Sequence, residues 1–431
     1  MERDLPTRAD VPAKNWAGNV TYQASARLTP TSVAELSEAV TAHERVKAVG
    51  TRHSFNDAAD TDADGVQVSL EAMPDDVRLD PGTGVVSAPG GLTHAQLAAV
   101  LHEQGRALPN LASLPHISVA GAVQTGTHGS GVGNPALSSQ VVAVELVDAD
   151  GVAQRVARGD DDFAAVSVGL GAFGVVHRVE LATVPAFEVE SRVFEGLTWE
   201  ALLPRWDDVL GGGYSVSLFT RYDTDEVEQV WVKRVPGGAG GDAVEVLAGL
   251  GAREAAEPLH MLPGMPVENL TPQLGSHGPW HERLPHFRSD FLPSAGEEIQ
   301  AEYLLPAEAA ADAVAAMRAL APVVAPLLHV SELRRVAADE AWLSPSSGRD
   351  SLAVHFTFKL DVDAVAAVLP DVEAALLPLG ARPHWGKAFA CDATALRAAY
   401  PRFDDFRAVL ARRDPRGRFE NPYLRRVLGP R

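Results

Sequence analysis

The fold of this chain is governed by SLPHISVAGAVQTGTHGSG, residues 113–131, and by a shorter turn, GTRHSFN, at residues 50–56. Glycines and small hydroxyl residues allow consecutive backbone N–H groups to point to one side. Such turns make a concave surface of donors for an anion such as a diphosphate. The alternative is that both are ordinary surface loops, and composition alone leaves that alternative open.

Each turn follows a strand and a helix. Before the first turn, SVAE at residues 32–35 has the pattern of a helix capping box, and residues 46–49 predict a short apolar strand. Before the second turn, residues 85–88 predict a strand, and Thr93 is placed to cap a helix that Gly105 ends. The sequence therefore contains two similar units, each of which ends in a glycine-punctuated turn.

From about residue 185 the pattern changes to longer predicted strands that alternate with helices. The predicted strands are 187–193, 214–220, 229–235, 299–304, 329–336 and 353–358, and the predicted helices are 199–210, 308–320 and 362–377. Residues 260–293 carry six prolines and predict an irregular segment. We therefore predict an α+β protein with a first domain of residues 1–184 and a second domain of residues 185–390.

Charge and composition restrict the partners of the protein. Among 431 residues, 57 Asp and Glu outnumber 37 Lys and Arg, which gives a formal net charge of −20 and argues against nucleic acid or an anionic membrane. A single cysteine, Cys391, excludes an intramolecular disulfide. Residues 1–15 lack the apolar region of a secretory signal, and no run of about 18 apolar residues predicts a membrane span. We expect a cytoplasmic protein.

The segment GLGAFG at residues 169–174 matches the dinucleotide fingerprint G-x-G-x-x-G. That fingerprint needs a strand before it and a helix after it, so that the helix N-terminus can hold a pyrophosphate. Here the predicted order is reversed, because residues 161–168 favour a helix and residues 175–181 favour a strand. We therefore reject a nicotinamide site at this turn.

Polar side chains alternate on two strands of the second region. Side chains two residues apart on a strand share a face, so Glu332 and Arg334 project together, as do His355 and Thr357. A sheet face with an acid, a guanidinium, an imidazole and a hydroxyl suits a polyol, which needs donors and acceptors at each hydroxyl. The alternative is two solvated sheet faces with a surface ion pair.

Lysine is rare in this chain and occurs only at positions 14, 47, 233, 359 and 387. Arginine supplies the other cations, so a lysine can mark a position where a proton must be lost, which arginine cannot do. If Lys387 were partly buried and near Arg334, desolvation and like charge would lower its pKa. The alternative is a solvated lysine in a turn.

Taken together, these motifs resemble the vanillyl-alcohol oxidase flavoprotein superfamily, and most closely its polyol-oxidising members. The resemblance runs from about residue 15 to the C-terminus and covers both turns. It also includes NWAGN at 15–19, ASLPHIS at 112–118, HWGK at 384–387 and GRFENPY at 417–423. It implies a two-domain vanillyl-alcohol oxidase/PCMH-type FAD-binding fold with a mixed-sheet substrate domain, in which the tail of about 391–431 completes the FAD domain.

The resemblance implies FAD bound covalently through a ring nitrogen of His53. A neutral imidazole is a competent nucleophile toward the 8α-methyl group of a flavin, so the implied bond is chemically reasonable. No metal ligand spacing is recognised among the other histidines. The remaining residues that the resemblance places at the cofactor are Val49, Gly50, Thr51, Arg52, Ser54, Ser113, Ser118, Gly121, Ala122, Val123, Gln124, Gly174, Val176 and His384.

The implied reaction is oxidation of the terminal primary hydroxyl of an alditol such as xylitol or sorbitol to the aldose, with O₂ reduced to H₂O₂. Lys387, Arg334 and His355 would be catalytic, and Ser113, Glu332, Arg334 and Thr357 would bind the substrate. The enzymatic alternative is a gulonolactone-type aldonolactone oxidase of the same superfamily. The other alternative is a flavin-binding or carbohydrate-binding protein without turnover. We expect a monomer whose partners are the polyol and O₂.

Overall fold

The computed structural model describes residues 14–238, 242–291 and 297–431. Its first part contains a parallel sheet in the order β1 (Ala26–Leu28), β3 (Val66–Ser69), β2 (Val46–Val49). Helix α1 (Val33–Ala42) connects β1 to β2, and the Ser32 hydroxyl caps it by accepting the Glu35 N–H at 3.2 Å. The predicted cap and strand are therefore confirmed. The first glycine turn, residues 50–56, begins where β2 ends.

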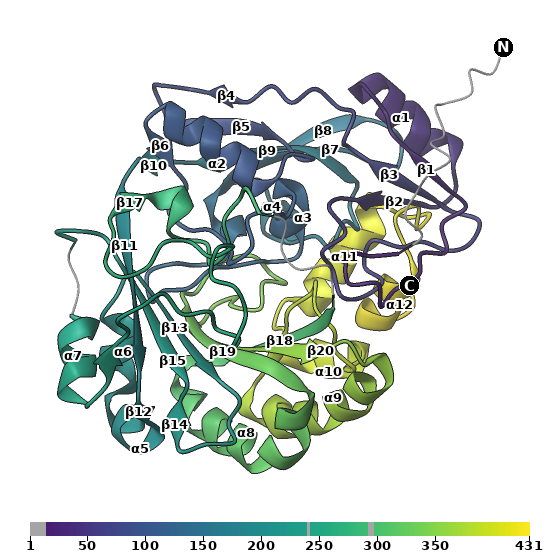
Figure 1. The fold of residues 1–431 in the computed structure, drawn as a ribbon. Coiled ribbons are helices and arrows are strands. Elements are labelled where there is room, and N and C mark those ends of the chain that lie inside the picture. The colour runs from purple at the N-terminus through teal and green to yellow at the C-terminus, as the bar shows by residue number, and fades with distance from the viewer. Residues whose placement is uncertain (1–13, 239–241, 292–296) are drawn as a thin grey trace.

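An antiparallel sheet of five strands lies beside this unit (Figure 1). Its order is β4 (Arg78–Leu79), β5 (Val85–Pro89), β9 (Val175–Ala182), β7 (Val141–Val147) and β8 (Ala153–Ala157). Two helices follow β5 in the chain: α2 (His94–Glu103), which Thr93 caps as predicted, and α3 (Val119–Gln124), which begins within the second turn. A short pair, β6 (Arg106–Ala107) and β10 (Val184–Pro185), closes this part.

A nine-stranded antiparallel sheet forms the second part, and most of it lies in the lower half of Figure 1. Helices α8 (Ala310–Val324) and α9 (Val362–Leu376) lie below it in that view. Its order is β16 (Arg253–Glu254), β11 (Glu188–Glu195), β15 (Gln229–Arg234), β13 (Ser215–Thr220), β19 (Leu328–Val336), β20 (Ser351–Lys359), β18 (Glu298–Pro306) and β21 (Arg382–Pro383), with β17 (Gly278–Pro279) paired to β11. The α+β prediction is confirmed.

The predicted helix 199–210 is interrupted. Pro204 has no backbone N–H to continue the helical hydrogen bonds. The segment therefore divides into α5 (Trp199–Leu202), a 3₁₀ turn (Leu203–Arg205) and α6 (Trp206–Gly211). The other short elements are α4 (Phe163–Val166), α7 (Ala243–Gly249), β12 (Leu197–Thr198) and β14 (Glu226–Val227).

The C-terminal helices α10 (Ala393–Ala399), α11 (Phe403–Arg413) and α12 (Pro422–Leu428) return to the first part of the chain. Figure 1 shows α11 and α12 in yellow beside the purple N-terminal segments. The Val46 N–H donates to the Arg418 carbonyl at 2.9 Å, and Phe419 is buried in the core cluster that contains Leu36 and Val68. These contacts favour the predicted domain limits, which we keep as a proposal.

One helical stretch, Ala307–Leu327, is long and apolar enough to cross a membrane, with a mean hydropathy of 1.4. Helix α8, the central part of this stretch, buries Ala313, Val314 and Met317 inside the protein. On its exposed side, Arg318 pairs with Asp225 at 2.7 Å. This pattern is typical of a helix that covers a sheet. The predicted lack of a membrane partner stays a prediction.

Candidate active site

One cavity lies between the two glycine turns and the nine-stranded sheet. Its lining includes every residue that the sequence placed at the cofactor or the substrate except Val123, whose side chain packs in the core. These residues come from separate parts of the chain. The structure therefore brings the predicted residues together around a single space.

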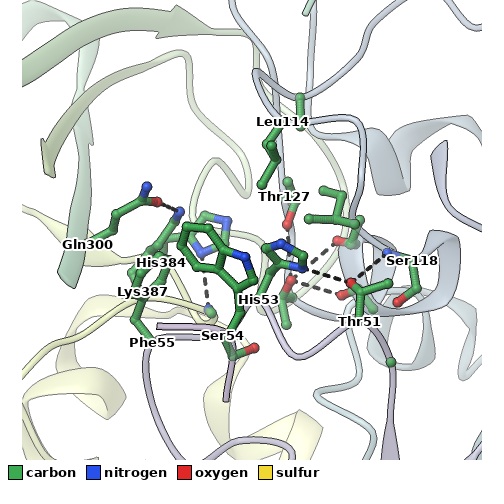
Figure 2. Close-up of a pocket in the computed structure, with 18 of the residues that line it drawn as sticks. Thr51, His53, Ser54, Phe55, Leu114, Ser118, Thr127, Gln300, His384 and Lys387 are labelled. Atoms are coloured by element: carbon green, nitrogen blue, oxygen red, sulfur yellow. Dashed lines mark hydrogen bonds between the residues drawn. The ribbon is translucent and has the colours of Figure 1, made fainter. Parts of the chain in front are cut away.

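His53 lies in the first turn, directly after β2, and lines this cavity (Figure 2). Its Nδ1 is 3.1 Å from the Thr51 hydroxyl, whereas its Nε2 has no hydrogen-bond partner among the described residues. The ring stacks on Trp16, with 5.1 Å between ring centroids. Burial, with smaller contributions from the charges of His116 and Lys387, lowers the pKa of His53 to about 4. The imidazole is therefore neutral at physiological pH.

The two turns are rich in glycine because their backbones approach other groups closely. A Cβ atom on Gly50 would collide with the Ser118 Oγ, and one on Gly121 would lie 2.7 Å from the same atom. The Ser118 N–H donates to the Thr51 hydroxyl at 3.3 Å and joins the turns directly. The two turns therefore form one continuous glycine-lined wall.

The rejected fingerprint forms a third part of this wall. Its last glycine, Gly174, has φ of 151°, and a Cβ there would lie 2.5 Å from the Val147 carbonyl oxygen. The Gln124 side chain holds the turn, since its Nε2 donates to the Val166 carbonyl at 3.0 Å and its Oε1 accepts the Gly171 N–H at 3.2 Å. As predicted, a strand follows these glycines, so no helix begins on them.

Two further motifs fix the position of the His53 turn. The Asn15 side chain donates to the Ser54 carbonyl at 2.8 Å, and the Asn56 side chain donates to the Trp385 and Lys387 carbonyls at 2.8 and 2.7 Å. The turn around His53 is thereby bonded to the segment that carries Lys387.

Another side of the cavity is one face of the large sheet. Phe219 on β13, Glu332 on β19, His355 on β20 and Glu302 on β18 are cross-strand neighbours in one row. Arg334, Thr357 and Gln300 lie two residues from members of that row and so share its face. The predicted pairs, Glu332 with Arg334 and His355 with Thr357, therefore do share a face.

Glu302 connects the charged groups of this face and is 2% exposed. Its Oε1 accepts from Arg334 Nη2 at 2.5 Å and lies 3.3 Å from His128 Nε2, and its Oε2 lies 3.4 Å from His355 Nδ1. Burial alone would raise the pKa of Glu302, but Arg334 and the histidines outweigh it and hold the pKa well below its usual range. Glu302 therefore stays ionised and balances the charge of Arg334.

Lys387 lies at the edge of this network. Its Nζ donates to the Gln300 side-chain oxygen (Figure 2) and lies 4.9 Å from the centre of the Phe55 ring. Burial lowers the pKa of Lys387 to about 8; the Arg334 charge acts in the same direction, and the Glu302 charge opposes it. The predicted direction of the shift is the one that the structure gives.

Several residues of the cavity escaped the sequence reasoning: Gln300, Glu302, His128 and His286. Gln300 and Glu302 alternate with apolar residues in the predicted strand 299–304, so the same two-residue spacing that marked Glu332 and Arg334 was present in their strand. His128 and His286 come from irregular segments. No local pattern distinguishes them from structural histidines.

Three side chains of the cavity, His128, Glu302 and His384, place potential metal-ligand atoms within 4.8 Å of one another. A metal is nevertheless a poor fit, because Glu302 already accepts from Arg334 through Oε1. A nearby guanidinium also repels a cation. The cluster is better described as a hydrogen-bonded network, and the expected lack of a metal stays a prediction.

Comparison with known proteins identifies the family. A model described as "FAD binding domain" matches residues 24–157, and one described as "D-arabinono-1,4-lactone oxidase" matches residues 296–427. The chain is 48% identical to an alditol oxidase from a Streptomyces species over 96% of this chain and 98% of that protein. The chain belongs to the alditol oxidase family. It is therefore an FAD-dependent oxidoreductase, and the superfamily and the cofactor inferred from sequence are confirmed.

More distant similarities extend beyond this alditol oxidase. An L-gulono-1,4-lactone dehydrogenase from Mycobacterium tuberculosis is 31% identical over 96% of this chain and 99% of that protein. The structure of cholesterol oxidase from B. sterolicum matches with a TM-score of 0.75 at 13% identity, covering 99% of this chain and 100% of that chain. The latter likeness confirms the fold.

The cavity fits FAD on grounds of its own. Gly50, Gly121 and Gly174 allow close backbone approaches along the glycine-lined wall, and His53, whose buried Nε2 has no hydrogen-bond partner among the described residues, lines the same cavity. Thr51, Ser54 and Ser118 add small hydroxyl groups along that wall. The residues of the two turns would hold the cofactor.

Proposed function

We propose that this protein oxidises the terminal primary hydroxyl of an alditol to the aldose. When bound, FAD would supply the oxidant, which accepts hydride from the carbinol carbon and passes the electrons to O₂ to give H₂O₂. The observation that carries the proposal is the row of donors and acceptors on β18, β19 and β20, which faces the same cavity as Lys387 and the His53 turn. The 48% identity to an alditol oxidase supports it.

Alcohol oxidation requires removal of the hydroxyl proton as the hydride leaves, so a base or a polarising cation must lie beside the reacting oxygen. Lys387 has a pKa of about 8, so a large fraction of its amine is neutral and able to accept that proton near this pH. Arg334 stays charged and would polarise the hydroxyl oxygen. His355, 3.3 Å from the Thr357 hydroxyl, would accept or donate at the same oxygen.

The other polar residues would fix the orientation of the polyol. The Arg334 Nη1 donates to the Ser113 hydroxyl at 3.2 Å, which places Ser113 at the junction of the second turn and the sheet. Glu332 offers a carboxylate to the inner hydroxyls, and Thr357 adds a neutral donor and acceptor. His384, which lines the cavity between Lys387 and His128, would contact the cofactor.

An anaerobic visible spectrum tests this proposal. The purified protein should be yellow, and addition of xylitol or sorbitol should bleach the flavin band; readmission of air should restore the band and produce H₂O₂. A band that does not bleach with any alditol would contradict the proposal and leave a flavin-binding protein without turnover.

The second candidate is an aldonolactone oxidase. It is favoured by the match of residues 296–427 to a D-arabinono-1,4-lactone oxidase model and by the 31% identity to an L-gulono-1,4-lactone dehydrogenase. Oxygen consumption should be compared with xylitol, sorbitol and gulonolactone at matched concentrations. Turnover of the lactone alone would replace the first candidate by the second.

We further propose that the flavin is linked covalently to His53. The neutral ring, its unpartnered nitrogen and its position at the cavity support this assignment. Denatured wild-type protein should retain a fluorescent flavin band on a gel, and His53→Ala should release the flavin. Free flavin from the denatured wild type would contradict the link.

We propose a cytoplasmic monomer without a membrane partner. The single cysteine and the net charge of −20 support this assignment. Cell fractionation, and light scattering of the purified protein for a mass near 45.7 kDa, test it. Membrane-bound protein or a multiple of that mass would contradict it.

A further inference from the structure

A second lysine, Lys233, is buried on the same face of the sheet as Glu332 and Arg334. It lies on β15, which is separated from β19 by β13, and is 1% exposed. Its Nζ donates to the Leu284 carbonyl and, at 3.0 Å, to the Pro285 carbonyl, and it lies 3.1 Å from the His286 Nδ1. A buried cation is costly unless it is fully hydrogen-bonded, and these three partners use its three donors.

His286 connects this lysine to the proposed substrate site. Its Nε2 lies 2.9 Å from Glu332 Oε1, and the ring is held edge-on by Trp231 and Phe219, with centroid distances of 5.1 and 5.6 Å. The backbone N–H of His286 also donates to the Ser113 carbonyl at 3.0 Å. The imidazole is therefore fixed in place and bridges Lys233 and Glu332.

The chemistry of these contacts determines where the proton of the ring lies. If Lys233 is an ammonium, it can only donate, so the His286 Nδ1 accepts and the hydrogen must be on Nε2. If the proton has moved to the ring, both ring nitrogens carry hydrogen. In either arrangement the Nε2 hydrogen points at Glu332, so the Lys233–His286 pair presents a donor to that carboxylate.

We propose that Lys233 and His286 are positioning residues, which hold the Glu332 carboxylate in place so that its second oxygen is free to accept hydroxyls of the polyol. This inference rests on the proposed function. Glu332 Oε2 is 3.7 Å from Arg334 Nε, beyond hydrogen-bond distance, so it retains capacity for a substrate hydroxyl. Neither Lys233 nor the ring of His286 is assigned any contact with the reacting carbon.

A purely structural role for Lys233 would be to hold the segment of residues 284–286 against the sheet. The two roles differ in what a substitution changes. Loss of a structural bond lowers stability and flavin content, whereas loss of the positioning bond raises the KM for a polyol and leaves kcat nearly unchanged, because the reacting hydroxyl is bound by other residues.

The first experiment is Lys233→Met, assayed with sorbitol by steady-state oxygen consumption. We expect KM to rise about tenfold and kcat to change less than threefold. Lys359→Met is the control, since Lys359 also donates to a backbone carbonyl, that of Pro326 at 2.7 Å, but far from Glu332. An unchanged KM in Lys233→Met, with active wild-type enzyme, would overturn the positioning role.

A matched pair at position 286 tests the same link if Lys233→Met does not fold. The amide nitrogen of Gln can take the place of Nε2, and that of Asn only the place of Nδ1. His286→Gln should therefore keep KM within about threefold of wild type, whereas His286→Asn should raise it about tenfold. Equal KM values for the two variants would overturn the proposal.

A double variant shows whether Lys233 acts through the ring. In the His286→Gln background no tautomer needs to be fixed, so adding Lys233→Met should change KM less than twofold. A tenfold rise in KM in this background would mean that Lys233 does not act through the ring and would overturn this part of the proposal. If no alditol reduced the flavin of the wild-type enzyme, the proposed function itself would fail. That outcome is distinct from failure of the positioning role.

Discussion

Lys387 is the residue whose charge state matters most to the proposed chemistry. An ordinary lysine, with a pKa near 10.5, is almost entirely protonated at neutral pH and is a poor base. Burial in the cavity wall and the nearby Arg334 lower the pKa of Lys387 to about 8, while Glu302 limits the shift. Near pH 8, Lys387 is therefore present both as the protonated ammonium and as the neutral amine, and the neutral amine can accept a proton.

The first prediction concerns the pH dependence of flavin reduction. Because only the neutral amine accepts a proton, the rate with saturating xylitol should rise about tenfold per pH unit below pH 8 and level off above it. Lys387→Met should keep its flavin, lose this rise and reduce the flavin at least 100-fold more slowly at pH 8. Anaerobic stopped-flow absorbance measures both quantities.

Lys359→Met provides the control for this prediction, because Lys359 is exposed and lies outside the cavity. It should reproduce the wild-type profile. If Lys387→Met instead retained the rise with pH, the titrating base would be another group, and His355 would be the next to replace.

At the scale of elements, the wall of the cavity depends on a close approach between β9 and β7. Gly174 begins this approach with φ of 151°, and a Cβ there would lie 2.5 Å from the Val147 carbonyl oxygen. Backbone atoms of a central strand cannot move aside without disturbing the sheet. A side chain at position 174 would therefore strain the backbone. It would also disturb the glycine-lined wall of the cavity.

Gly174→Ala should accordingly destabilise the protein by about 1–3 kcal/mol and lower its flavin content. Gly249→Ala is the matched control, since Gly249 is helical and a Cβ added to it would meet no other atom within 4 Å; it should be neutral or slightly stabilising. Thermal unfolding and the ratio of flavin to protein absorbance measure the effects. Equal results for the two variants would show that the close approach relaxes easily.

The elements also show how far sequence reasoning could reach. Alternation along a strand correctly predicted that Glu332 and Arg334 share a face, because that relation is local. It did not predict that β18 lies beside β20, since strand order depends on packing of distant segments. Glu302 was therefore missed, although its own strand was predicted.

At the scale of the molecule, the site joins segments that are far apart in the sequence. The Phe55 N–H donates to the Gly386 carbonyl at 2.8 Å, and the Tyr423 hydroxyl donates to the Trp385 carbonyl at 2.8 Å. Contacts of this kind leave no periodic signal, so spacing could indicate two anion-binding turns and two polar strand faces but not that they meet around one cavity. Resemblance to a family supplied the link to Lys387, and neither source indicated the bridge from Lys233 through His286.

Buried neutral histidines make the stability of the whole molecule depend on pH. His94, His177 and His286 are each less than 9% exposed, and burial lowers the pKa of each to about 4. In the unfolded chain their pKa values return to about 6.5. Between pH 6.5 and 4 the unfolded state therefore binds more protons, and the free energy of unfolding falls as the pH falls.

Asp339 has the opposite effect on how stability changes with pH. Burial raises its pKa to about 6, so the folded state binds its proton first and acidification from pH 6 to 4 favours folding. Three histidines outweigh one aspartate, and each group contributes at most about 1.4 kcal/mol per pH unit. The net result should be a loss of stability on acidification within this window.

Replacing one histidine isolates its contribution to the pH dependence of the free energy of unfolding, because the contributions of the other groups are the same in variant and wild type. His94 contacts the Ile117 carbonyl through Nδ1 at 3.3 Å, and the amide of Asn can make a similar bond without titrating. Wild type should therefore lose stability faster than His94→Asn as the pH falls from 6.5 to 4, by up to about 1.4 kcal/mol per pH unit. Unfolding midpoints in urea at several pH values measure the difference. Parallel curves for the two proteins would mean that His94 is protonated in the folded state as readily as in the unfolded chain, and that its burial has no effect on its charge.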